Sequence, residues 1–317
     1  MKLENIKIRQ DLSEEEIAKY ACKKNRINFN SVKQYEILKK SIDARNKDDV
    51  HYIYSIEIIT LDEMDKQEKK ETTIPKVTNI EEPVAIVGAG PAGLFCAITL
   101  IENGVKPIIV EQGKKVEERM KDVEEFIENG KLNPLSNVQF GEGGAGTFSD
   151  GKLTTNLHNP LCKKVIETFI KFGAPSEIGY INKPHIGTDN LVKILQNIRK
   201  YLLDNRAEIL FQEKVKDLEI EEDKIKGIIC ESGKEIKANT VVLAIGHSAR
   251  DTFEMLDKNG ILMEAKPFSV GARIEHLQKT TDIAQFGAES QKLKLPPADY
   301  KLAVHLKNGR GVYTFCM

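Results

Sequence analysis

A glycine-rich turn between an apolar strand and an apolar helix constrains this chain more than any other feature. Gly88-Ala89-Gly90-Pro91-Ala92-Gly93 directly follows the strand-like run Val84–Val87. In this order the first glycine permits a tight turn, the second lets a pyrophosphate approach the backbone, and the third lets the helix pack closely on the strand. Unpaired amides at the start of the helix favour the phosphate anion. The segment predicts a dinucleotide-binding βαβ unit; a glycine turn without a ligand is the alternative.

A carboxylate stands at the end of the next predicted strand. Glu111 follows Gly88 by about 20 residues, where an acidic side chain can accept hydrogen bonds from ribose hydroxyls. The fingerprint alone does not separate NAD from FAD. The run Glu111-Gln112-Gly113, with Arg119 after it, resembles the flavin-binding members of the glutathione-reductase-like superfamily. That resemblance implies FAD contacts for Gln112, Gly113 and Arg119, whereas a solvated helix face is the alternative for Arg119.

A second glycine-rich loop covers Phe140–Asp150 and repeats the G-x-G-x-x-G spacing at Gly141, Gly143 and Gly146. No apolar strand precedes it and no apolar helix follows, so it is not a second dinucleotide fold. We expect a nest of backbone amides around pyrophosphate or the flavin ring, against the alternative of a flexible loop. The predicted cofactor contacts here are Gly144, Ala145, Gly146, Thr147, Ser149 and Lys152.

Short strands are predicted over residues 208–211, 215–220, 225–231, 235–236 and 240–245. In the same superfamily a β-meander ends in an apolar strand and a small-residue turn that touches the flavin nucleotide. The stretch VVLAIGHSA is similar to that element. The similarity implies contacts from the Val215 backbone to adenine and from Gly246 to the cofactor. Alternatives are a core role for Val215 and a surface or packing role for His247.

The first 61 residues predict a small ferredoxin-like α+β domain. Ser13-Glu14-Glu15-Glu16 is a capping box that starts a helix running to about Lys24, after a strand at Asn5–Arg9. Val32–Lys39 and His51–Thr60 alternate as strands do. A charged linker is expected over residues 62–82, followed by the FAD-binding domain at 83–250 and the start of a substrate or C-terminal region at 251–317.

Several motifs occur in one order along the whole chain: FGEGGAGTFSDGKLTT, KPHIGTDNL, LAIGHSARDTFEML and KPFSVGARIEH. Together they resemble the bacterial FAD-dependent dehydrogenase-like family, also called NAD(FAD)-utilising dehydrogenases. The resemblance implies a Rossmann-like three-layer FAD/NAD(P)-binding domain with an inserted substrate region. It further implies an FAD-dependent oxidoreductase with NAD(P)H as a candidate electron donor, but no particular substrate. The candidate catalytic residues within these motifs are Lys152, His185, His247 and Arg273.

The chain departs from that family at its end. Members continue through a Cys-Pro-Gly-Gly stretch and a terminal segment that returns to the flavin, whereas this sequence stops at Phe315-Cys316-Met317. No Gly-Asp dipeptide, the usual late flavin contact of the superfamily, occurs in it. We therefore expect an incomplete flavin site.

Charge and cysteine usage limit the remaining possibilities. The 47 Lys and Arg residues against 48 Asp and Glu give a net charge of −1, so no general basic field gathers nucleic acid. A flavoprotein acting on RNA is thus a weaker alternative, and a non-catalytic FAD-binding scaffold is another. The five cysteines are widely spaced without a C-x-x-C pair, which predicts no metal site and no thiol pair that carries electrons. No apolar run or signal sequence is present, which favours a cytoplasmic protein.

Overall fold

The computed structural model describes residues 1–61, 83–148, 151–153, 155, 157, 159–288 and 295–314. The chain divides into two units. The first comprises Met1–Glu71, Ser176–Pro184 and Phe268–Met317, and the second comprises Thr72–Pro175 and His185–Pro267. The predicted linker at 62–82 lies outside the described residues.

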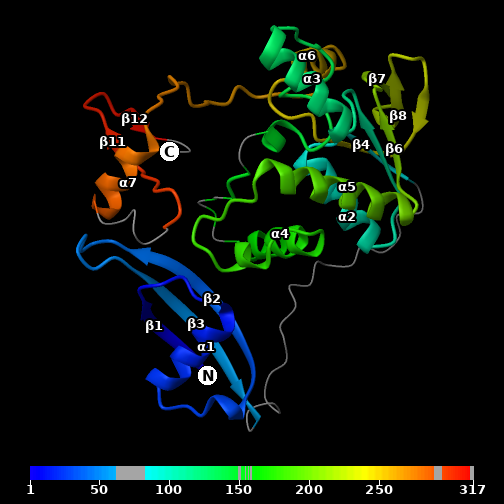
Figure 1. Cartoon of the computed structure of the whole chain (residues 1–317). Coiled ribbons are helices and arrows are strands. Elements are labelled where there is room, and N and C mark those ends of the chain that lie inside the picture. The colour runs from blue at the N-terminus through cyan, green and yellow to red at the C-terminus, as the bar shows by residue number, and fades with distance from the viewer. Residues whose placement is uncertain are drawn as a thin grey trace. The chain divides into compact units, whose positions relative to one another are not determined.

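A four-stranded parallel sheet forms the centre of the second unit (Figure 1). It consists of β4 (Val84–Val87), β5 (Pro107–Glu111), β6 (Glu208–Phe211) and β10 (Thr240–Leu243), in the order β10-β4-β5-β6. The helix α2 (Pro91–Glu102) connects β4 to β5. All residues of β4 and β5 are buried, as expected for parallel strands covered on both faces. The predicted βαβ unit is confirmed.

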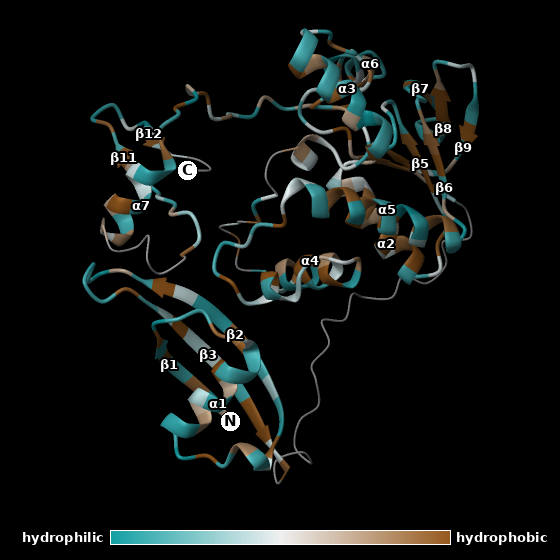
Figure 2. Cartoon of the chain, in the orientation of Figure 1, coloured by the Kyte–Doolittle hydropathy of each residue, from teal (hydrophilic) through white to brown (hydrophobic). Residues whose placement is uncertain are grey.

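Two further layers cover this sheet. Because side chains alternate along a strand, Ile86 points toward α2, while Ala85 and Val87 pack with a second cluster on the opposite face. The helix α5 (Thr188–Asp204) contacts α2 and the edge strand β6. The second cluster is formed with an antiparallel meander of β7 (Val215–Glu221), β8 (Lys224–Cys230) and β9 (Glu235–Lys237), whose apolar residues are brown in Figure 2. This arrangement confirms the predicted three-layer α/β fold.

Three more helices complete the second unit. The helix α3 (Val116–Asn129) ends at Gly130 in the left-handed conformation, and α4 (Pro160–Lys171) begins after Asn159, whose side chain accepts a hydrogen bond from the Leu161 amide. The helix α6 (Arg250–Lys258) follows the sheet. Apolar residues at helical spacing, together with Gly130, Asn159-Pro160 and Gly173, predict helices near 115–129, 160–172 and 188–204, and the structure has all three.

The first unit contains β1 (Lys2–Ile8), α1 (Glu14–Lys24), β2 (Val32–Asp43) and β3 (His51–Thr60). The antiparallel order β1-β3-β2 is that of the first half of a ferredoxin-like unit. The predicted capping box is present, since Ser13 and Glu16 exchange hydrogen bonds. Ile17 and Ala21 of α1 pack on the sheet in one buried cluster.

Other segments of the first unit come from later in the sequence. The backbone of Lys40 in β2 exchanges hydrogen bonds with Tyr180 and Asn182, so residues 176–184 add to the edge of the sheet. The helix α7 (Gln278–Phe286) and the strand pair β11 (Ala303–His305) and β12 (Gly311–Tyr313) also belong to this unit. No helix within the described ranges is long and apolar enough to cross a bilayer.

Candidate cofactor-binding site

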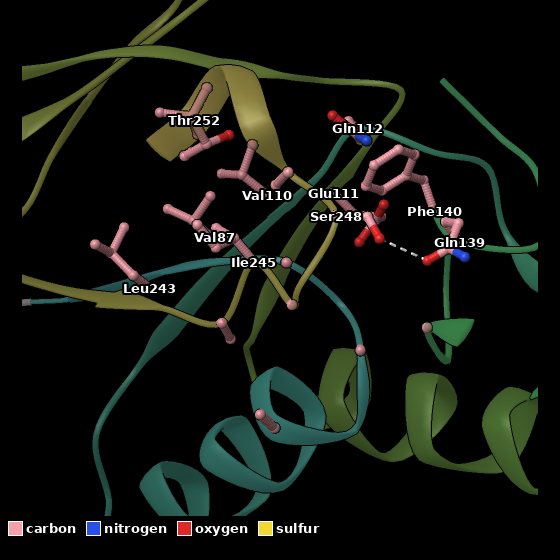
Figure 3. Close-up of a pocket in the computed structure, with 18 of the residues that line it drawn as sticks. Val87, Val110, Glu111, Gln112, Gln139, Phe140, Leu243, Ile245, Ser248 and Thr252 are labelled. Atoms are coloured by element: carbon pink, nitrogen blue, oxygen red, sulfur yellow. Dashed lines mark hydrogen bonds between the residues drawn. The ribbon is translucent and has the colours of Figure 1, made fainter. Parts of the chain in front are cut away.

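A pocket of about 560 Å³ lies in the second unit at the carboxyl ends of the parallel strands (Figure 3). Val87, Glu111 and Leu243, the last residues of β4, β5 and β10, all line it. The chain leaves β4 toward β5 on one side, while β10 lies on the other side of β4. Such a switch point leaves a crevice outside the strand ends, where open α/β sheets bind their ligands.

The chain itself requires two of the three fingerprint glycines. Gly88 has φ +107°, and a Cβ there would lie 2.4 Å from the carbonyl oxygen of Ala244, the residue after β10. A Cβ at Gly93 would lie 2.0 Å from the carbonyl oxygen of Gly88. Both distances are far below any tolerated contact. These two glycines therefore serve the close packing of loop, helix and sheet.

Gly90 differs from its neighbours. Its φ of −73° and ψ of −178° suit any residue, and a Cβ would meet only the Cα of Gly144 at 3.8 Å. Gly90, Pro91 and Ala92 all line the pocket, and α2 starts there without a side-chain cap. No contact among the described residues requires a glycine at this position. The free space at Gly90, together with the uncapped amides of α2, fits a phosphate anion that touches the backbone.

Glu111 fastens the fingerprint loop to the end of β5. The carboxylate is 5% exposed, and its two oxygens accept hydrogen bonds from the amides of Ala89 and Gly113, each at 2.8 Å. Each oxygen has a second lone pair, and Glu111 also lines the pocket. The predicted ribose contact stays a prediction. The bracing role was not foreseen from the sequence.

The second glycine-rich loop packs directly on the first. The Gly143 amide donates a hydrogen bond to the Ala89 carbonyl at 2.8 Å, and a Cβ at Gly144 would lie 3.0 Å from Cδ of Pro91. The loop follows no strand in the described chain and leads into a short 3₁₀ helix at Ala145–Phe148, so it is not a second dinucleotide fold, as predicted. Gly144 and Ala145 line the pocket, whereas the remaining predicted contacts, Gly146 and Thr147, do not. Ser149 lies outside the described residues.

Arg119 lies inside the protein, so the alternative of a solvated helix face is wrong. Its side chain is 0% exposed and donates hydrogen bonds to the carbonyls of Asn137 and Glu142 at 2.8 Å and of Val138 at 3.1 Å. It also lies over the Phe148 ring, 4.9 Å from the centroid. Burial lowers the pKa of the guanidinium to about 10. Arg119 is not among the pocket-lining residues, so it positions the second loop, and its predicted FAD contact remains a prediction.

A buried carboxylate also ties this loop to its surroundings and was missed by sequence reasoning. Oε2 of Glu142 accepts hydrogen bonds from the Val116 amide at 2.8 Å and from Nη1 of Arg199 at 2.6 Å. Arg199 also donates to Glu117 at 2.7 Å. Burial raises the pKa of Glu142 to about 7. A lone glutamate among four glycines is the one signal in the sequence that could have indicated this role.

The opposite wall of the pocket comes from β7 and the turn after β10. Val215 is 6% exposed, belongs to the core cluster and also lines the pocket. It is therefore a core residue and a pocket residue at once. Gly246 and His247 line the pocket as well. The Ser248 hydroxyl donates a hydrogen bond to Oε1 of Gln139 at 2.8 Å, shown as a dashed line in Figure 3. Phe140 and Ser248, from two segments expected at the cofactor, also line the pocket, and further lining residues that the sequence did not indicate are Gln139, Thr252 and Phe253.

Three of the four candidate catalytic residues, Lys152, His185 and His247, belong to the second unit. His247 is the one that lines the pocket. Lys152 and His185 are neighbours in an antiparallel β-bridge, away from the pocket wall. Arg273 belongs to the first unit and forms an ion pair with Glu275 at 2.9 Å. Gln112 lines the pocket, whereas Gly113 packs against Gly141, whose Cα would lie 2.5 Å from a Cβ at Gly113.

Parts of the chain match known families of FAD-binding proteins. Residues 81–121, which include β4, the fingerprint and β5, match the FAD binding domain family. The cofactor is FAD. Residues 190–283 match the family of glucose inhibited division protein A, and residues 267–317 match the FAD-dependent protein, C-terminal domain-like family. Residues 1–59 match a domain of unknown function.

Individual proteins resemble all or part of the chain. An uncharacterized protein of Clostridium beijerinckii is 40% identical over 332 aligned positions, which cover 100% of this chain and 62% of that protein. The chain therefore spans less than two thirds of this relative. Thiamine thiazole synthase of Methanococcus vannielii is 27% identical over 54% of each chain. Among solved structures, Thermovibrio ammonificans THI4 aligns with 17% identity and a TM-score of 0.39, covering 57% of this chain and 64% of that one.

Proposed function

We propose that this chain is the cofactor-binding part of an FAD-dependent oxidoreductase that exchanges electrons with NAD(P)H. The observation that carries the proposal is the position of Gly90. Its lack of a side chain has no purpose in the protein's own packing, but it opens the pocket wall at the uncapped start of α2. The match of residues 81–121 to the FAD binding domain family supports FAD as the cofactor.

In this proposal different residues of the pocket bind different parts of FAD. The backbone of Gly90 to Ala92 holds the pyrophosphate at the start of α2, and Glu111 accepts from the ribose hydroxyls. The Val215 backbone faces adenine, and Gly144 and Ala145 close the opposite side. When bound, FAD supplies the hydride-transfer chemistry, while the protein supplies binding, orientation and exclusion of water.

His247 is the proposed polar group nearest the reacting end. It lines the pocket at the turn after β10, next to Ser248, whose hydroxyl is held by Gln139. An imidazole there can donate or accept a hydrogen bond. Lys152 and His185, which pair in a β-bridge of the same unit, remain candidate catalytic residues. Arg273 remains a candidate through its motif alone.

The finer assignments are also proposals. We place the FAD-binding domain at residues 83–250 and the start of a substrate or C-terminal region at 251–317, supported by the family match at 267–317. The motifs favour the bacterial FAD-dependent dehydrogenase-like family. No feature of the pocket selects a substrate, so the proposal specifies the electron donor and not the acceptor.

The test is an anaerobic titration of the chain reconstituted with FAD. The spectrum of bound flavin should appear first, and NADH or NADPH should then bleach its absorbance in a single turnover. Dithionite serves as the control that the bound flavin is reducible. Bound flavin that dithionite bleaches and neither nicotinamide does would contradict the proposed electron donor and favour the scaffold alternative. Failure to bind FAD at all would contradict the assignment of the pocket.

A further inference from the structure

The first unit contains a second, polar pocket that the FAD function does not use. It measures about 340 Å³ and lies between the start of α1, the sheet and the segment at residues 176–184. Its polar wall is formed by Asp11, Glu14, Lys40, Tyr54, Glu177 and Tyr180. We infer that this pocket binds a small organic cation with primary amino groups.

Tyr54 is the first observation that points to a ligand. Its side chain is 0% exposed and lines the pocket, and its hydroxyl has no partner at normal hydrogen-bond distance among the described residues, although the Asp11 carboxylate is near enough to act on it. Buried polar groups in proteins almost always have a partner, so one left without a partner at a pocket wall indicates a missing one. Burial and the nearby Asp11 carboxylate raise the pKa of Tyr54, which keeps the phenol neutral. Its oxygen can therefore accept a hydrogen bond from an ammonium group.

The charge of the wall selects the class of ligand. Asp11, Glu14 and Glu177 contribute three carboxylates against the single ammonium of Lys40. Lys40 is already compensated, because its Nζ lies 2.6 Å from Asp11 and 4.7 Å from the centroid of the Tyr52 ring. The pocket thus keeps an excess of negative charge, which attracts a cation and repels an anion.

The start of α1 does not offer an anion site. The Ser13 hydroxyl accepts the Glu16 amide at 3.4 Å, and a Glu16 oxygen accepts the Ser13 amide at 2.9 Å. These bonds satisfy amides that would otherwise hold a phosphate. Glu14, Glu15 and Glu16 in the first turn already compensate the positive end of the helix dipole.

A bare metal ion fits the pocket poorly. No three acidic, histidine or cysteine side chains converge on a metal position anywhere in the described part of the chain. The acceptors are distributed instead: Glu14 is joined to the Tyr180 hydroxyl at 3.0 Å, whereas Asp11 is joined to Lys40. A ligand with several N–H donors on a short carbon chain can reach separate acceptors, as a single ion cannot. This distribution favours an amine over a divalent cation.

Calorimetric titration of the full chain with 1,4-diaminobutane tests the inference. Succinate and 1,4-butanediol have four-carbon chains but carry negative and no charge, and magnesium chloride tests the metal. We expect the diamine to bind and its affinity to fall with added salt, while the other three give no binding heat. Succinate, butanediol or magnesium binding as tightly as the diamine would overturn the inference, as would no diamine binding.

Two substitutions locate the site. Tyr54→Phe removes only the unpaired oxygen and should weaken diamine binding at least tenfold without lowering the melting temperature. Tyr52→Phe is its matched control, since this neighbouring buried tyrosine is not part of the pocket wall.

Should Tyr54→Phe fold poorly, Glu177→Gln removes one charge from the exposed wall and should weaken binding several-fold. Glu15→Gln in α1, outside the wall, is the control for that variant. Unchanged diamine affinity in both Glu177→Gln and a folded Tyr54→Phe would show that the amine binds elsewhere.

Discussion

Replacing Gly90 with alanine should separate cofactor binding from folding. The residue has φ −73° and ψ −178°, which alanine adopts without strain, and the added Cβ lies 3.8 Å from Gly144. We therefore expect the free energy of unfolding of the apoprotein to stay constant or to rise by about 0.4–1 kcal/mol, because alanine restricts the unfolded chain more than glycine does.

The same methyl group should weaken FAD binding. It projects into space that the pocket leaves open at the start of α2, where we place the pyrophosphate. Adding a methyl to a filled site costs about 1–3 kcal/mol. That penalty corresponds to a dissociation constant raised roughly 5- to 150-fold. The larger Gly90→Val should abolish binding.

The two neighbouring glycines should behave in the opposite way. In Gly88→Ala and Gly93→Ala the new Cβ would meet backbone oxygens at 2.4 and 2.0 Å, so the apoprotein itself should lose stability. Gly271→Ala adds a methyl in open space and is the control. The measurements are denaturant unfolding of the apoproteins and quenching of flavin fluorescence on binding. Wild-type FAD affinity in Gly90→Ala, or a loss of stability equal to that of Gly93→Ala, would refute the reasoning.

Three further predictions concern Arg119, Glu142 and Cys96. Arg119→Met leaves the carbonyls of Asn137, Val138 and Glu142 without their donor, so the melting temperature should fall by an amount equivalent to about 3 kcal/mol, and a loss below about 1 kcal/mol would contradict the bracing role. Burial raises the pKa of Glu142 from 4.5 to about 7, so the folded state holds a proton that the unfolded chain releases, and this group's contribution to stability falls as pH rises through that window. Through this one group, the free energy of unfolding changes by at most about 1.4 kcal/mol per pH unit. The change between pH 5 and pH 7.5, measured by denaturant titration, should be smaller in Glu142→Gln than in the wild type. An equal change in both proteins would exclude Glu142 as its source. Cys96→Ala should leave reduction of the flavin by a nicotinamide intact, because burial raises the pKa of that thiol and the described cysteines are all free; loss of reduction with FAD still bound would show that the thiol carries electrons.

Local signals were sufficient for most of the secondary structure. The periodic apolar residues of α5 predicted its bounds, Thr188–Asp204, and the Ser13 capping box predicted the start of α1. Gly130 and Pro160 marked a helix end and a helix start. Each of these signals acts within one or two turns of chain, so no knowledge of the tertiary structure is needed to interpret it.

Sheet membership could not be predicted in the same way. The strands between residues 208 and 245 formed one run in the sequence, but β6 and β10 join the parallel sheet while β7, β8 and β9 form a separate meander. The pairing of residues 176–184 with β2 had no signal at all, because it consists of backbone hydrogen bonds at Lys40 between segments far apart in sequence. Any residue type can supply such bonds.

The same limit applied to the site. Glu111 is predicted to accept from ribose hydroxyls, and the structure adds that both its oxygens accept hydrogen bonds from backbone amides of the protein. The hydrogen bond from Ser248 to Gln139 joins residues 109 positions apart, so no local sequence pattern predicts it. Sequence reasoning found the residues whose role depends on their immediate neighbours and missed those whose role depends on a distant partner.

The glycines of the second loop show how a motif can have two explanations. A Cβ at Gly141 would lie 2.4 Å from Cδ of Arg119, and one at Gly143 would lie 2.4 Å from Cδ1 of Leu195. Packing against a buried arginine and a helix thus accounts for these glycines without any ligand. Gly90 has no such explanation, since its nearest contact is an ordinary one. The glycine content of the second loop is therefore weak support for an anion nest, and the case for the cofactor site depends on Gly90 and the uncapped helix beside it.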